Sequence, residues 1–204
     1  MINSLVLLTI LFVTSGIGPV PIGPSSGALN APQNFTGDAD PKSWKAFSSP
    51  EGQFTVLMPG TPKEEIQYKQ TELGQIEIHL FVLQSSGAAY ITSYADFPIT
   101  ATTPEMVEKM LDGARDNVLA NSTRKLLEES KISLDGLSGR EMKIGMPDLV
   151  LKTRFYVAQR RLYQVMMITP DPNQISKKAV AGQNANATKF LGSLKIIQAG
   201  SKRI

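Results

Sequence analysis

The chain has 204 residues, 42% of them apolar, which is enough for one folded domain with its own core and a leader or tail. Its 21 basic and 18 acidic side chains give a formal net charge of +3 and are interspersed, so a nucleic-acid partner is not expected. The absence of cysteine excludes disulfides, thiolate metal sites and a lipid-modified cysteine anchor, and a single histidine excludes a histidine-rich site, so we expect neither metal nor cofactor.

The first 40 residues differ from the rest because no charged side chain precedes Asp38. Leu5–Val13 is a nine-residue apolar run, typical of a signal peptide and shorter than the roughly 20 residues of a membrane-spanning helix. Small residues at Ser26–Ala28 suit a cleavage site. We therefore expect residues 1–28 to be a signal peptide and the protein to be exported, periplasmic or extracellular, without a stable transmembrane anchor. An uncleaved anchor and a misplaced start codon are the alternatives.

Residues 29–43 have the polar, proline-containing composition of a linker. A single domain is expected over residues 44–197, followed by a basic tail over residues 198–204. Three Asn-x-Ser/Thr sequons, at Asn34, Asn121 and Asn186, would matter only in a eukaryotic secretory pathway.

The domain begins with FSSPEGQFTVLMPGTP, residues 47–62, in which a short apolar run lies between two clusters of turn residues. A phosphate-binding loop needs the spacing GxxxxGK[ST], but Gly52 and Gly60 are eight residues apart and no lysine follows Gly60 directly. We therefore predict a strand over Phe54–Met58 with a turn at each end.

Most later segments also favour strands, because they are short, rich in β-branched and aromatic residues, and bounded by turn residues. Gln75–Leu83 alternates apolar and polar residues, the period of a half-buried strand. Its hairpin partner is Glu65–Lys69, with a turn near Leu73. The other predicted strands are Ala89–Ala95, Lys131–Leu134, Gly139–Ile144, Leu149–Val157 and Leu162–Thr169, the last two forming a hairpin.

Two segments are predicted to be helical. Thr103, Pro104 and Glu105 form a helix start, with apolar residues at helical spacing behind them up to Leu119. A second helix is expected from about Ser176 to Leu191. Strands in runs with two separate helices favour an α+β fold, in which a largely antiparallel sheet packs between or against helices.

His79 is the only histidine, and histidine is the side chain most often used as a general base. Glu77 lies two residues earlier, on the same face of the predicted strand. A small hydrolase or ligand-modifying enzyme using this pair is therefore one hypothesis. An exposed side chain on a strand is the other interpretation, and no serine has the G-x-S-x-G context of a nucleophile. We expect no catalytic residue.

Aromatic and arginine side chains share one face of the predicted sheet. Such residues are enriched at protein interfaces. They are also typical of an ordinary solvated sheet face. As candidate partner-binding residues on an exposed sheet face we take Arg154, Tyr156, Arg161, Tyr163 and Tyr94. The methionines, by contrast, are expected to fill the core.

The order of elements from Trp44 to Ile197 resembles that of small exported domains of the Mog1/PsbP type. The resemblance depends on these segments: WKAFSSPEGQFTVLMPGTPKEE, SYADFP, GREMKI, LKTRFYVAQRRLYQVMMITP and KFLGSLKI. It implies an α-β-α sandwich used as a non-catalytic binding or assembly module. Members include extrinsic photosystem II subunits, a nuclear Ran-binding factor and periplasmic bacterial proteins.

Only the fold is carried over from this resemblance, and no functional residue. The chain lacks the leader cysteine of some bacterial members, has one histidine, and begins with an apparent export signal, unlike a nuclear protein. Our first hypothesis is therefore an exported, non-enzymatic domain that contacts a protein or an envelope component through its exposed sheet face.

Overall fold

The computed structural model describes residues 44–71, 74–85 and 87–197. The expected signal peptide (1–28), linker (29–43) and basic tail (198–204) lie outside these residues, as do Asn34 and the turn residue Leu73. The elements in chain order are β1 (Lys45–Ser49), β2 (Phe54–Met58), β3 (Lys63–Thr71), β4 (Gly74–Ser85), β5 (Ala88–Asp96), α2 (Pro104–Leu119), β6 (Lys125–Leu134), β7 (Leu137–Met146), β8 (Leu149–Ala158), β9 (Arg161–Pro170), the 3-10 turn η1 (Pro172–Gln174), α3 (Lys177–Leu191) and β10 (Lys195–Ile196).

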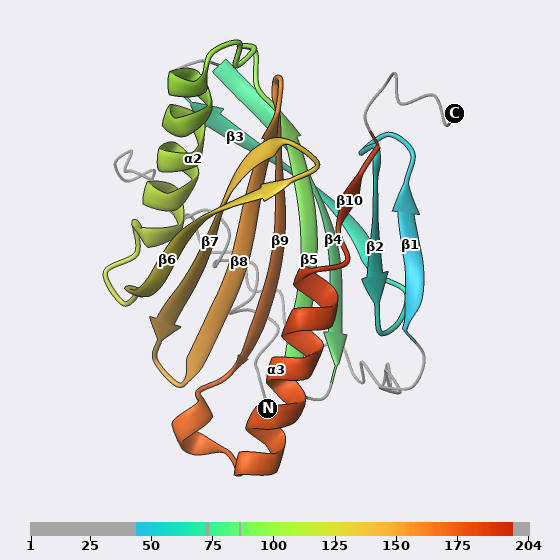
Figure 1. Ribbon diagram of the computed structural model, residues 1–204, viewed down its shortest axis with the longest axis vertical. Coiled ribbons are helices and arrows are strands. Elements are labelled where there is room, and N and C mark those ends of the chain that lie inside the picture. The colour runs from blue at the N-terminus through green and yellow to red at the C-terminus, as the bar shows by residue number, and fades with distance from the viewer. Residues whose placement is uncertain (1–43, 72–73, 86, 198–204) are drawn as a thin grey trace, which may run out of the picture.

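The centre of the described part is a seven-stranded sheet in the order β3-β4-β5-β9-β8-β7-β6 (Figure 1). All of its neighbouring strands run antiparallel. The β6–β7 hairpin turns through Asp135 and Gly136, both with positive φ, as a tight two-residue hairpin turn requires. Strands β1, β2 and β10 form a separate small sheet.

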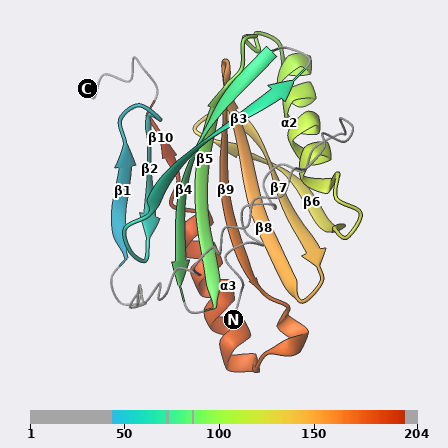
Figure 2. The ribbon, with the colours of Figure 1, turned by 180° about the vertical axis from the view of Figure 1, so that it is seen from behind.

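Each face of the large sheet carries a second layer. Helix α2 covers one face, where its Leu111 packs with Ile78, Ile91 and Ile144 of the strands. On the other face, α3 and the small sheet bury a second cluster, which includes Tyr90, Val165, Phe54 and Phe190. Figures 1 and 2 show α2 and α3 at opposite sides of the sheet. The central strands β5 and β9 are therefore buried on both faces along most of their length.

Helix α2 begins where its sequence predicts. The Thr103 side chain accepts a hydrogen bond from the backbone N–H of Met106, and Pro104 occupies the first turn, where its missing N–H costs nothing. Ser176 caps α3 in the same way, through the backbone N–H of Ala179.

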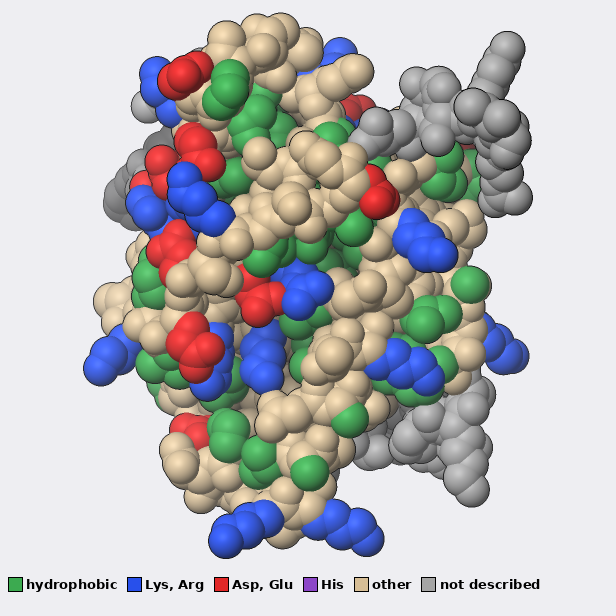
Figure 3. Space-filling view, viewed as in Figure 1, with side chains coloured by type: hydrophobic (Ala, Val, Ile, Leu, Met, Phe, Trp, Pro, Cys, Tyr) green, Lys and Arg blue, Asp and Glu red, His purple; other side chains and the backbone are tan. Residues whose placement is uncertain are grey.

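Arg140 of β7 fixes the position of α2. Its guanidinium is almost completely buried and contacts Glu108 at 3.0 Å and Asp112, both on α2, and Glu129 of β6 at 3.2 Å. Burying a charge is costly unless it is paired and hydrogen-bonded, and here three carboxylates surround it. Figure 3 shows acidic and basic side chains next to one another over α2. The helix is thereby held over β7 and β8, the strands that it contacts most.

The α+β class, the antiparallel sheet and the two helices agree with the sequence-based prediction. Three strands differ from it. β1 and β10 were not predicted, because β1 is mostly exposed and polar, and β10 has two residues that pair with the distant Thr55 and Phe54. β6 begins at Lys125 instead of Lys131, because its first half lies at a solvent-exposed sheet edge without apolar alternation.

Replacing Arg140 by methionine should lower the free energy of unfolding by about 2 to 3 kcal/mol, because Glu108, Asp112 and Glu129 would lose their shared partner next to the core. Urea unfolding followed by circular dichroism measures this. Lys131→Met is the matched control, since Lys131 also pairs with Glu108 but is 77% exposed, and it should cost less than about 0.5 kcal/mol. Equal losses in the two variants would contradict the proposed role of Arg140.

Candidate functional site

The face expected to be exposed is buried within the chain. Tyr94, Tyr156 and Tyr163 are at most 5% exposed, because α3 and the small sheet lie over them. The prediction of an exposed Arg/Tyr face was therefore wrong: a period-two pattern shows which residues share a face, but not what covers that face. A partner-binding role of the set is not tested by this burial.

The polar groups of the set hold the covering layer in place. The Tyr163 hydroxyl donates to the Gly52 carbonyl at 2.9 Å, and Arg161 donates to the Glu51 carbonyl at 2.7 Å, so both bind the β1–β2 turn. Arg154 donates to the Leu191 carbonyl at the end of α3, at 3.2 Å. These side chains thus make contacts of the kind expected for an interface, but with the chain itself.

Arg161 also forms a bidentate ion pair with Asp96, with N–O distances of 2.8 and 2.7 Å. The hydrogen bond from Arg161 lowers the pKa of Asp96, although partial burial opposes the shift. The guanidinium of Arg161 lies 4.5 Å from the centre of the Tyr94 ring, and His79 stacks on the same ring at 4.5 Å.

His79 lies between two carboxylates. Its Nε2 is 2.8 Å from Glu77, the predicted partner, and its Nδ1 is 3.2 Å from Glu64 of the neighbouring strand. The three cavities described for the chain have other linings, none of which includes His79. The expected pair is therefore present, and it lines none of these three cavities.

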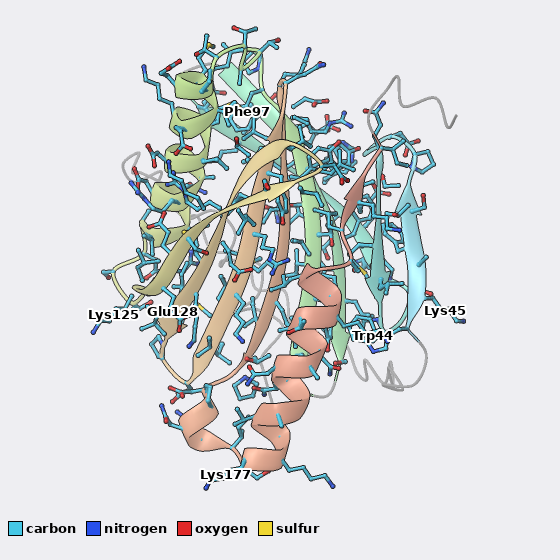
Figure 4. The ribbon with its side chains drawn as sticks, viewed as in Figure 1. Trp44, Lys45, Phe97, Lys125, Glu128 and Lys177 are labelled. Atoms are coloured by element: carbon cyan, nitrogen blue, oxygen red, sulfur yellow. The ribbon has the colours of Figure 1, made fainter. Side chains whose placement is uncertain are left out.

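The largest of these cavities lies on the opposite face of the sheet. It has a volume of about 850 Å³ and lies between α2, strands β3, β4, β5, β8 and β9, and the loop that follows β5. We call it the α2 groove. It exists because α2 is held over β7 and β8 and leaves the β3–β5 side of this face open. In Figure 2, α2 and the end of β3 lie side by side, and Figure 4 places Phe97, which lines the groove, at the top of the sheet next to α2.

Helix α2 presents three stripes of residues at helical spacing. Leu111, Ala114 and Val118 are its buried residues and pack on the sheet. Glu108 and Asp112 point to Arg140. Between the first stripe and β3, the groove is lined by Met106, Met110, Gly113 and Asn117. The sequence predicted these methionines as core filling, which holds for Met142, Met166 and Met167. Met110 is only partly buried against the core, and with Met106 it lines the groove.

Polar groups lie at the floor of the groove. Ser93 and Gln164 are both buried, and the Ser93 hydroxyl is 3.5 Å from the Gln164 carbonyl oxygen. The Gln164 amide donates to the Thr153 hydroxyl at 3.2 Å. Sequence reasoning missed this group, because each residue replaces an apolar one on a different strand, and only the pairing of the strands brings them together.

The rim of the groove carries lysines. Lys69 of β3 reaches across to hydrogen-bond the side chain of Asn117 on α2, and burial lowers the pKa of its ammonium. Lys109 is exposed on α2, and no ion pair is found for it in the described part of the chain. Asp116, the acidic residue of the lining, is paired with Arg115 at 2.9 Å.

Within residues 44–71, 74–85 and 87–197, no group of three or more histidine, cysteine, aspartate or glutamate side chains is arranged to hold a metal ion. No helix in the same residues is both long and apolar enough to cross a membrane.

No protein-family model matches the sequence, and a comparison with curated proteins gives no match either. Among solved structures, the chain is similar to a protein of unknown function from Pseudomonas aeruginosa, with 15% identity, 60% of this chain and 94% of that chain covered, and a TM-score of 0.38. It is also similar to the cyanobacterial PsbP of Synechocystis, with 10% identity, 83% and 99% covered, and a TM-score of 0.45. The second match belongs to the family that the sequence resembles; at these identities and scores neither match indicates a function.

Replacing Asp96 by asparagine should lower the free energy of unfolding at pH 7 by about 1 kcal/mol, allowing for the partial exposure of the ion pair. Because the hydrogen bond from Arg161 holds the folded-state pKa of Asp96 below its ordinary value, the contribution of Asp96 is complete above the unfolded-state pKa and is lost as the pH falls through the folded-state pKa. The free energies of unfolding of the wild type and Asp96→Asn, measured by urea unfolding from pH 7 down to about pH 3, should therefore converge at low pH. A constant difference at all pH values would contradict this role of the ion pair.

Proposed function

We propose that this chain is an exported, non-catalytic binding module, and that its α2 groove holds a long-chain molecule with an acidic head group. The observation that carries the proposal is the groove itself, whose volume of about 850 Å³ is typical of small-molecule sites. Such sites are lined mainly by apolar side chains, with a few polar groups that orient the ligand, as Ser93 and Gln164 would do here.

The shape of the groove favours an elongated ligand. Its helical wall runs from Met106 to Val118, which at 1.5 Å per residue is about 18 Å. An unbranched hydrocarbon chain can lie extended along such a wall, and each buried methylene contributes about 0.8 kcal/mol. Met106 and Met110 are unbranched and flexible, so they can adjust to chains of different length.

The charges at the rim favour an acidic head group. Asp116 is paired with Arg115, whereas Lys109 has no carboxylate partner in the described residues. Lys69 lies at the same rim, where it hydrogen-bonds Asn117, and its positive charge also favours an anion nearby. An acyl chain with an acidic head is the chemistry of an envelope lipid. The proposal therefore keeps the expected envelope partner and moves its site from the Arg/Tyr face to the α2 groove.

The remaining parts of the proposal come from the sequence. Export is supported by the apolar run Leu5–Val13 and the small residues at Ser26–Ala28, which lie outside the described residues. The single domain over residues 44–197 and the α-β-α sandwich of Mog1/PsbP-type domains belong to the proposal as well, and both are supported by the sequence resemblance. The enzyme hypothesis is less favoured, because both ring nitrogens of His79 already face carboxylates and His79 lines none of the three cavities.

Replacing Gly113 by leucine should abolish binding in the groove. Gly113 lies in the wall of α2, and a Cβ atom added there meets no other atom within 4 Å, so the new side chain fills the groove without strain. Isothermal titration of the purified protein with dodecanoate should show binding by the wild type and a loss of affinity on the order of tenfold or more in Gly113→Leu. The melting temperature should stay equal or rise, because glycine is unfavourable inside a helix.

Gly182→Leu is the matched control, since Gly182 lies inside α3, has equally open surroundings and does not line the groove. It should leave dodecanoate binding unchanged. No binding by the wild type, or equal loss in both variants, would contradict the proposed ligand site.

Replacing Lys109 by glutamate should weaken the binding of dodecanoate about tenfold, because a carboxylate at the rim would repel the acidic head group. The affinity for dodecanol, which has the same chain and no charge, should change little. Titration of both ligands separates the two contributions. Equal losses for the acid and the alcohol would contradict recognition of an acidic head and leave only a role of Lys109 in the shape of the rim.

A further inference from the structure

Strand β3 is a long, free edge of the large sheet. In the described part of the chain it pairs with β4 alone, from Lys63 to Thr71, without a break in register. Free edges of this kind present unpaired backbone groups, and proteins usually blunt them with bulges, prolines or charges. The opposite edge, β6, is blunted by an irregularity between Leu126 and Glu128. β3 has no such irregularity.

Two large apolar side chains stand on this edge. Ile66 is 48% exposed and Tyr68 is 63% exposed, and both project from the same face because they are two residues apart. Glu65 and Lys69 lie on the other face of the strand. The strand therefore carries an apolar pair on one face and charges of opposite sign on the other, all within five residues.

We propose that β3 pairs with β3 of a second copy of this chain, antiparallel and centred on Gln67, so that one sheet continues through both copies. In this register Ile66 lies opposite Tyr68, and Glu65 lies opposite Lys69, and the two-fold axis repeats each pair. Aromatic and β-branched pairs and opposite charges are the cross-strand pairs that stabilise antiparallel strands. The edge is complementary to itself.

The side chains of β3 favour the register centred on Gln67 over the two adjacent registers. Centring the pair on Ile66 would bring Lys63 opposite Lys69, and like charges in that position are destabilising. Centring it on Tyr68 would leave Ile66 opposite Gln70, without an apolar partner. The bond from Lys69 to Asn117 does not prevent the pairing, because an ammonium has three donors. The ion pair of Glu65 with Lys63 is long, at 3.7 Å, and Lys63 is well exposed.

The absence of cysteine allows a direct test of the register. With Gln67→Cys, the two new thiols face each other across the axis, at the Cα separation of about 4.5 to 5.5 Å that suits a disulfide. Under mild oxidation the purified protein should form a covalent dimer, seen by non-reducing electrophoresis and removed by dithiothreitol. Gln70→Cys is the control, since its thiols would be about 20 Å apart and should not cross-link. No covalent dimer from Gln67→Cys, or equal cross-linking by both variants, would overturn the proposal.

Sedimentation equilibrium tests the apolar pair. Tyr68→Lys should raise the dimer dissociation constant on the order of tenfold or more, because it removes an apolar partner of Ile66 twice per dimer. Leu127→Lys is the matched control: Leu127 is 45% exposed on the opposite edge, and its replacement should leave the dissociation constant unchanged. Both variants should melt within a few degrees of the wild type. A wild type that is monomeric at all concentrations, or equal effects of both variants, would overturn the proposal.

Discussion

The ion cluster around Arg140 determines where α2 lies, and the rest of this face follows from that position. A buried guanidinium must be paired, and its partners Glu108 and Asp112 lie on one stripe of α2, so the helix is drawn towards β7 and β6. The adjacent stripe of Leu111, Ala114 and Val118 then packs over β8. A single helix is too narrow to cover seven strands, and because this one is held to one side, the uncovered part of the sheet remains in one continuous region, the α2 groove.

The other face of the large sheet is covered in a different way. Here the sheet is covered by α3 and by a small sheet that unites the beginning and the end of the described chain, since β10 pairs with β2. This layer is fastened by side chains of the large sheet that donate to backbone carbonyls: Tyr163 to Gly52, Arg161 to Glu51 and Arg154 to Leu191. The carbonyls at a turn and at a helix end lack partners in their own elements, and burial without a donor would be costly. Aromatic and arginine residues therefore serve here as an interface within one chain.

The sequence predicted those features that depend on local patterns. The helix start at Thr103 placed α2, the helix expected from about Ser176 to Leu191 is α3, and the alternation in β4 identified its two faces correctly. It did not predict β1 and β10, whose pairing with β2 is stabilised by contacts with distant residues and not by their own composition. The burial of Tyr94 and Tyr156 could not be predicted for the same reason, because alternation carries no information about the second layer. The α2 groove was missed because Met106 and Met110 have the spacing of core residues, and only the offset position of α2 leaves them facing a cavity.

Lys69 is common to the two proposed interactions, and this has a physical consequence. Its ammonium lies at the rim of the α2 groove and, in the proposed dimer, opposite Glu65 of the second copy. An acidic head group and that carboxylate would each be attracted to this one ammonium. Whichever anion binds first reduces the favourable free energy that the second can gain from Lys69. Ligand binding and pairing of β3 would therefore oppose each other. Because binding free energies are linked reciprocally, the ligand would weaken the dimer by the same factor by which the dimer weakens ligand binding. The position of a single lysine would then connect the groove to the state of assembly.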